Sequence, residues 1–149
     1  MSVSRQPVDV LIAEDSEDDY LLAKDALKEN CPHLQLRWVR DGEELMDTLL
    51  RRGSYAGTDG PAPRLILLDL HMPRKDGWEA LKEIKEHPQL RLIPIVAFTT
   101  SNSAADVLYT YNLGINSFIR KPFGFQQFVD VMKTVDRYWF ELVRLPDEK

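Results

Sequence analysis

The chain has 149 residues, of which 44% are hydrophobic and 29% are charged, and its formal net charge at pH 7 is −5. This length and composition indicate one globular domain with a hydrophobic core and exclude a disordered chain. The acidic balance argues against a nucleic-acid partner, and the sequence contains neither a signal peptide nor an apolar stretch long enough for a membrane, so we expect a cytoplasmic protein.

Short apolar runs alternate with helical patterns along the chain. After a polar lead-in at 1–7, the expected order is strand Val8–Ala13, helix 20–29, strand Leu34–Val39, helix 44–52, strand 65–69, helix 78–86, strand 93–98, helix Ala104–Asn112, strand 115–119 and a helix from 125 past 140. Five alternations of strand and helix predict an α/β fold, with a parallel sheet, helices on both faces and right-handed crossovers.

The run 65–68 is continuously apolar, ends in Asp69 and stops at Pro73. A run without polar alternation is typical of a parallel strand that is covered on both faces. Asp69 would then lie at the carboxyl end of a central strand, where open α/β sheets bind ligands. An isolated aspartate at such a place is more often a turn or capping residue, so the other strand ends decide its meaning.

Polar side chains end the other strands as well. Glu14 and Asp15 follow the first strand, Thr99 ends the fourth and Lys121 follows the fifth. These ends share one edge of a parallel sheet, so the side chains should converge there. The next acids, 17–19, are explained by the start of a helix, where negative charge is favourable.

Three converging carboxylates repel one another unless a cation is present. A hard divalent ion with oxygen ligands, Mg²⁺, fits this set. A zinc site is not expected because no Cys or His cluster exists, and the lone Cys31 is expected to be structural. One carboxylate could then act as a nucleophile toward a phosphoryl group, with Lys121 and Thr99 stabilising the transferred charge.

The sequence resembles the receiver domains of two-component response regulators over about 8–139. The matching residues are Glu14-Asp15, Asp69, Met72-Pro73, Asp76-Gly77, Thr99 and Lys121-Pro122. The resemblance implies a flavodoxin-like, doubly wound, three-layer sandwich with strand order 2-1-3-4-5. It also implies a receiver domain at 8–141, a tail at 142–149 and no output domain.

The resemblance implies roles for the individual residues. Asp69 is the expected phosphoacceptor, and the expected Mg²⁺ ligands are Asp15, Asp69, Glu14 and the backbone carbonyl of His71. The protein would catalyse only its own phosphorylation, so it is not expected to be an enzyme in the usual sense.

Two further features follow from the same resemblance. Thr99 and Phe118 look like the family's switch pair, which would change the surface formed by the fourth helix, fifth strand and fifth helix. Lys121 and Pro122 are expected to be joined by a cis peptide bond.

Within this family the chain is most similar to small regulators paired with cyanobacterial phytochromes. The similarity lies in the block 68–78, in 98–101, in the long loop 53–63 and in the aromatic C-terminus. The expected partner is therefore a sensor histidine kinase of the phytochrome type.

Two alternatives from other classes remain open. A phosphatase of the haloacid-dehalogenase type also forms an aspartyl-phosphate, but its motif has a second acid where this chain has His71. A flavodoxin-like binding module would share the fold, yet no glycine-rich phosphate loop follows the first strand.

The last helix carries more apolar residues than one-sided packing requires. Excess apolar surface usually marks a contact site, and a two-fold homodimer is the commonest way to cover it. The residues expected at this interface are Val131, Tyr138, Phe140, Leu142, Tyr109 and Leu113.

Overall fold

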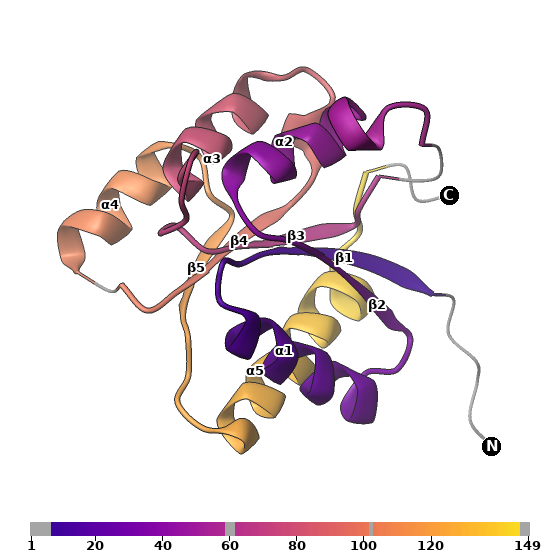
Figure 1. Cartoon of the computed structure of the whole chain (residues 1–149). Coiled ribbons are helices and arrows are strands. Elements are labelled where there is room, and N and C mark those ends of the chain that lie inside the picture. Colours follow the sequence, from indigo (N-terminus) through magenta and orange to yellow (C-terminus); the bar gives the residue numbers. More distant parts are fainter. Residues whose placement is uncertain (1–6, 59–61, 102, 147–149) are drawn as a thin grey trace.

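A computed structural model describes residues 7–58, 62–101 and 103–146, which form a five-stranded sheet between two helical layers (Figure 1). All neighbouring strands are parallel, and their order is β2-β1-β3-β4-β5. The predicted fold class and strand order are therefore confirmed. No helix within the described ranges is both long and apolar enough to cross a bilayer.

The elements follow the predicted order. The strands are β1 (Val8–Ala13), β2 (Leu34–Val39), β3 (Leu65–Leu68), β4 (Ile95–Thr99) and β5 (Ser117–Arg120), and the α-helices are α1 (Glu17–Asn30), α2 (Gly42–Leu50), α3 (Gly77–Glu86), α4 (Ala104–Asn112) and α5 (Phe125–Arg137).

The central strands bury alternate side chains in two separate cores. On β3, Ile66 and Leu68 belong to the core beneath α2 and α3, whereas Leu65 and Leu67 belong to the core beneath α1 and α5. Figure 1 shows α2, α3 and α4 on one side of the sheet and α1 and α5 on the other. Alternation with a period of two therefore buries both faces of a strand that is entirely apolar.

Side-chain caps fix where several helices begin at the functional edge. Ser16, Asp41, Asp76 and Ser103 each accept a hydrogen bond from a backbone N–H three residues ahead. Such caps satisfy amides that have no partner within the helix. Ser16, Asp41 and Ser103 follow the ends of β1, β2 and β4 closely, so these caps also fix the path of the connecting loops.

The C-terminal helix continues past α5 in one π-helical stretch, η3 (Tyr138–Leu142). This confirms the prediction that the helix runs beyond residue 140. Of the predicted tail 142–149, the structure describes 142–146, in which Leu145 is buried. Residues 1–6 of the predicted lead-in 1–7 and residues 147–149 of the predicted tail lie outside the described residues.

The long loop 53–63 begins with a 3₁₀ turn, Gly53–Tyr55, and its residues 59–61 lie outside the described ranges. Tyr55, Thr58 and Pro63 of this loop line a hollow of about 840 Å³. None of the predicted site residues lines that hollow.

Candidate functional site

The sheet's hydrogen bonding extends one residue past several strands and so places the site. The backbone N–H of Glu14 donates to Val39 O at 2.9 Å, and that of Asp69 donates to Ala13 O at 3.0 Å. On the other side of the sheet, Lys121 N donates to Thr99 O at 2.8 Å. Backbone pairing therefore holds these residues at one edge of the sheet without help from side-chain contacts.

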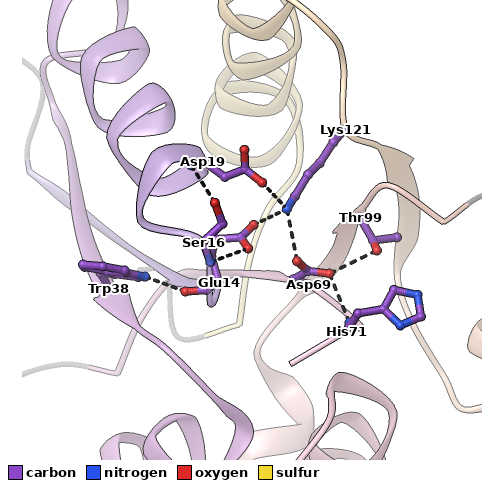
Figure 2. A network of polar contacts seen from close by, with 8 residues as sticks. All are labelled: Glu14, Ser16, Asp19, Trp38, Asp69, His71, Thr99 and Lys121. Carbon is purple, nitrogen blue, oxygen red and sulfur yellow. Dashed lines mark hydrogen bonds and ion pairs between the residues drawn. The ribbon is translucent and has the colours of Figure 1, made fainter. Parts of the chain in front are cut away.

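The ammonium group of Lys121 lies at the centre of an acidic cluster (Figure 2). Its Nζ contacts the carboxylates of Glu14, Asp19 at 2.9 Å and Asp69 at 3.1 Å. The side chains of Lys121, Glu14 and Asp69 are all at least nine-tenths buried, whereas that of Asp19 is partly exposed. The structure thus brings residues of the first, third and fifth strand ends together, as the sequence predicts.

The two carboxylate oxygens of Asp69 have different partners. Oδ1 accepts hydrogen bonds from the Thr99 hydroxyl and from the backbone N–H of His71, each at 3.1 Å. Oδ2 accepts a bond from Lys121 Nζ at 3.1 Å. These donors hold the carboxylate in one orientation within a site that is largely closed to water.

Burial changes the acid–base properties of this cluster. Desolvation, with the nearby charge of Asp69, raises the pKa of Glu14 to about 8, although the ammonium of Lys121 opposes the shift. Burial alone would lower the pKa of Lys121, but hydrogen bonds to Glu14 and Asp19 and the charge of Asp69 raise it above its usual value. Lys121 therefore stays a cation at neutral pH, and Glu14 holds a proton more tightly than an exposed glutamate does.

The acids at this edge are suited to a hard cation. Oxygen atoms of Glu14, Asp15 and Asp69 all lie within 4.8 Å of one another, and Asp15 is exposed at the mouth of the group. Three carboxylates, those of Glu14, Asp19 and Asp69, contact one ammonium, and Asp15 lies close to two of them, so negative charge is left to balance. A divalent ion with oxygen ligands fits that excess charge and that donor set.

One prediction at this edge is wrong. The described residues contain no cis peptide bond, so Lys121 and Pro122 are joined in trans. The trans form of an X–Pro bond is the more stable by about 0.5–1 kcal/mol. With that bond in trans, Lys121 Nζ already reaches its three carboxylates.

The predicted switch residues lie on neighbouring strands. Thr99 is completely buried and its hydroxyl faces Asp69. Phe118 pairs in register with Ala97 of β4, and its half-buried ring packs against the core beneath α2 and α3.

The predicted interface residues divide into two groups. Tyr138, Leu142 and Tyr109 are exposed, and 76% of the surface of Leu142 is accessible. Val131, Phe140 and Leu113 are half-buried and pack against the two cores. The apolar stripe of the last helix is therefore wide partly because the sheet and α1 cover more of it than expected.

Sequence reasoning missed three residues that organise the site. Asp19 was assigned to the helix start, yet its carboxylate also reaches Lys121; its place in the first turn of α1, just after the end of β1, was the available signal. Ser16 caps α1 and also donates its backbone N–H to Glu14 Oε2 at 3.1 Å. Trp38 donates from its indole nitrogen to Glu14 O at 2.7 Å, a contact for which the sequence carries no signal.

Comparison with known proteins gives a consistent family. Residues 10–133 match the response regulator receiver domain. The chain is 38% identical over 143 residues to the response regulator Rcp1 of Synechocystis sp., a match that covers 96% of each protein.

Solved structures agree. The phosphorylated cyanobacterial phytochrome response regulator RcpA superposes with a TM-score of 0.87 at 35% identity, covering 95% of this chain and 99% of that one. The Mn²⁺-bound form of Rcp1 gives a TM-score of 0.84 at 38% identity, covering 94% and 99%. These matches favour neither the phosphatase nor the flavodoxin-like module, and the chain belongs to the response regulator receiver domain family.

Proposed function

We propose that Asp69 accepts a phosphoryl group from a sensor histidine kinase, and that the chain works as a single-domain response regulator. The observation that carries this proposal is the setting of Asp69, a buried carboxylate held by Thr99 and Lys121 beside further acids. A carboxylate that served only to cap a helix or to close a turn would not require a buried ammonium and a pair of acids beside it.

In the proposed reaction an oxygen of Asp69 attacks the phosphorus of a phosphohistidine on the kinase. The O–P bond forms as the N–P bond breaks, and the electron pair returns to the imidazole nitrogen. Lys121 Nζ, 3.1 Å from Asp69 Oδ2, is placed to stabilise the oxygens of the transferred group, and the Thr99 hydroxyl donates a hydrogen bond from another side.

Mg²⁺ is the proposed metal, with Asp15, Asp69 and Glu14 as carboxylate ligands and the backbone carbonyl of His71 as a further ligand. Bound there, it would supply positive charge to the acids and to the phosphoryl oxygens. Two observations support this: the carboxylates lie close together, and a relative of this chain, Rcp1, has been crystallised with Mn²⁺.

The proposed phosphodonor is a kinase of the phytochrome type, acting in the cytoplasm. Support comes from RcpA, which is a cyanobacterial phytochrome response regulator and matches nearly the whole chain. A second supporting match is a response regulator in red-light signalling of R. palustris, with a TM-score of 0.88 at 30% identity.

The proposed output is a change in the surface formed by α4, β5 and α5. Thr99 ends β4, close before α4, and Phe118 lies on the neighbouring strand β5, in register with Ala97 two residues before Thr99. A phosphoryl group on Asp69 gives the Thr99 hydroxyl a charged partner, and the ring of Phe118 then repacks. Hydroxyl and ring together form a two-state element that phosphorylation biases.

A homodimer through the C-terminal helix is the proposed assembly. The exposed side chains of Tyr138 and Leu142 border a hollow of about 430 Å³, which Thr134, Arg137 and Glu141 also line. A two-fold axis here would bury the same apolar surface on both copies.

Incubation with acetyl phosphate tests the proposed function. With Mg²⁺ present, the intact mass should increase by one phosphoryl group, and chelation of the metal should prevent the increase. Asp69→Asn should not be labelled because the nucleophile is gone. Asp76→Asn is the matched control in the same loop, where the side chain caps α3; labelling of Asp69→Asn equal to that of the parent would refute the proposal.

A further inference from the structure

The indole of Trp38 contacts the loop that carries the two adjacent acids (Figure 2). Trp38 lies near the end of the edge strand β2, in register with Ile12 of β1, two residues before Glu14. Its Nε1–H donates to the backbone oxygen of Glu14 at 2.7 Å. We propose that Trp38 is a positioning residue for the metal site, and that it acts by fixing the peptide group between Glu14 and Asp15.

A peptide group is planar, so this hydrogen bond has consequences beyond one oxygen atom. The carbonyl of Glu14 and the N–H of Asp15 lie in the same rigid plane. Fixing the carbonyl therefore fixes the backbone from which Asp15 projects. Because the side chain of Asp15 is exposed, its direction depends on that backbone more than on packing around it.

The rest of the loop is held at neighbouring points. Glu14 N donates to Val39 O at 2.9 Å, and Ser16 N donates to Glu14 Oε2 at 3.1 Å. These bonds fix the residues on either side of the peptide group that Trp38 contacts. Without the indole bond, the Glu14–Asp15 peptide group would lose this restraint on its rotation.

The indole ring is itself held in place. The ring of Tyr20 stacks on it, with centroids 4.2 Å apart and planes 8° from parallel. The guanidinium carbon of Arg40 lies 4.3 Å from the Trp38 ring centroid. Stacking and cation–π contacts orient the ring before the loop is engaged, so the hydrogen bond costs little additional ordering.

Packing alone is the competing explanation, because Trp38 also borders the core beneath α1 and α5. Trp38→Phe separates the two roles: it removes the N–H donor and keeps an aromatic ring for stacking, and the ring area that it also loses is matched by the control. Trp139→Phe is the matched control, since Trp139 borders the same core from the C-terminal helix.

The test measures Mn²⁺ affinity from the loss of the free ion's electron paramagnetic resonance signal, with urea unfolding as a check on folding. Trp38→Phe should bind Mn²⁺ about two- to tenfold more weakly than the parent, the range expected for one hydrogen bond. Trp139→Phe should match the parent. At saturating metal, Trp38→Phe should be phosphorylated by acetyl phosphate as the parent is, because only the affinity for the metal has changed.

The inference rests on the proposed function, and the variants distinguish the two. Equal Mn²⁺ affinity of a folded Trp38→Phe and the parent overturns the role of Trp38 alone, as does an equal loss in Trp139→Phe. A parent that binds Mn²⁺ no better than Asp15→Asn overturns the proposed metal site and this inference with it.

A second measurement applies to the unmodified protein should Trp38→Phe fail to fold. The indole N–H resonance of Trp38 can be assigned by elimination, with Trp78→Phe and Trp139→Phe. Mg²⁺ should shift this resonance in the parent but not in Asp15→Asn. A Trp38 resonance that Mg²⁺ leaves unmoved overturns the inference.

Discussion

The carboxyl group of Glu14 can hold a proton or, in the proposed metal site, act as a ligand. Burial and the charge of Asp69 raise the pKa of this carboxyl to about 8 in the metal-free protein. Below that pH the group is mostly protonated, and a proton must leave before the carboxylate can act as a ligand. The affinity for the metal should therefore depend on pH in the neutral range, where an ordinary glutamate would already be fully ionised.

We expect the affinity for Mg²⁺ to rise with pH and to level off above about pH 9, with binding at pH 7 about tenfold weaker than on the plateau. Titration calorimetry at several pH values measures this. Glu14→Gln should bind more weakly, but its affinity should vary little over the same range because the titrating group is gone. A parent affinity that is constant from pH 6.5 to 9 would contradict the account of Glu14.

Gly77 packs against the backbone of Asp69, the proposed phosphoacceptor. A Cβ at this position would lie 2.4 Å from Asp69 O and 2.6 Å from the Cα of Leu70, too close for either to remain in place. Gly77 N also donates to Leu70 O at 3.0 Å. No side chain fits there without moving the segment that carries Asp69.

Gly77→Ala should therefore lower the free energy of unfolding by about 1–3 kcal/mol and slow the phosphorylation of Asp69. Urea unfolding and the rate of labelling by acetyl phosphate measure the two effects. Gly57→Ala is the control: it strains a positive φ of 79° but meets nothing within 4 Å, so it should leave the labelling rate unchanged. Unchanged stability and labelling in Gly77→Ala would show that the contact is not restrictive.

At the scale of elements, we expect β4 and α4 to link Asp69 to the proposed output surface. Only one residue of α4, Thr110, is buried, and its hydroxyl accepts a hydrogen bond from Trp78 Nε1 of α3 at 2.9 Å. A helix with so little buried surface shifts at low cost. The hydroxyl of Thr99, at the end of β4, is placed to impose such a shift.

Thr99→Ala should still accept a phosphoryl group on Asp69, but the amide hydrogen exchange of α4 should no longer change on phosphorylation. Hydrogen exchange followed by mass spectrometry measures this for 104–112. Thr134→Ala, which removes an exposed hydroxyl from α5, should respond as the parent does. An undiminished response of α4 in Thr99→Ala would exclude the hydroxyl as the link.

Much of the fold and part of the site could be predicted because short local patterns in the sequence determine both. Apolar runs that end in polar residues predicted the strands and placed Glu14, Asp69, Thr99 and Lys121 at one edge. Side-chain contacts between elements that are far apart in the sequence were harder to predict. The Asp19–Lys121 contact spans 102 residues and depends on the angle at which α1 leaves the sheet.

Other features had no local signal. A tryptophan at the end of an edge strand fills a core equally well with or without the Trp38–Glu14 bond. Similarly, a helical projection places Val131 and Phe140 beside the core stripe of the last helix. It does not show how far the neighbouring elements extend over that helix and cover these two side chains. Residues at the margin of that stripe were therefore assigned to an interface although they are half-buried.

At the scale of the whole molecule, only some of the predicted interface residues are exposed, and this decides which substitutions can test the proposed dimer. Phe140 packs against the core, so replacing it with a charge would destabilise the fold as well as any interface. Tyr138 and Leu142 are exposed, and both border the same hollow. Charges at these two positions should act on association alone.

We expect the parent to sediment with twice the mass of one chain at micromolar concentrations, and Tyr138→Glu combined with Leu142→Glu to sediment as a folded monomer. Sedimentation equilibrium with and without phosphorylation measures this. Leu92→Glu is the matched control, because Leu92 is an exposed apolar residue on the 3₁₀ turn Leu90–Leu92, outside the C-terminal helix. A parent that stays monomeric in both states would refute the dimer.

The chemistry at the sheet edge is tested most directly by locating the phosphoryl group. After incubation with acetyl phosphate and Mg²⁺, borohydride converts an aspartyl-phosphate to homoserine, which peptide mass spectrometry can locate. The account predicts homoserine at Asp69 in the parent, no homoserine in Asp69→Asn, and none in the parent without Mg²⁺. Homoserine at another aspartate in the parent, with Asp69 unmodified, would contradict it.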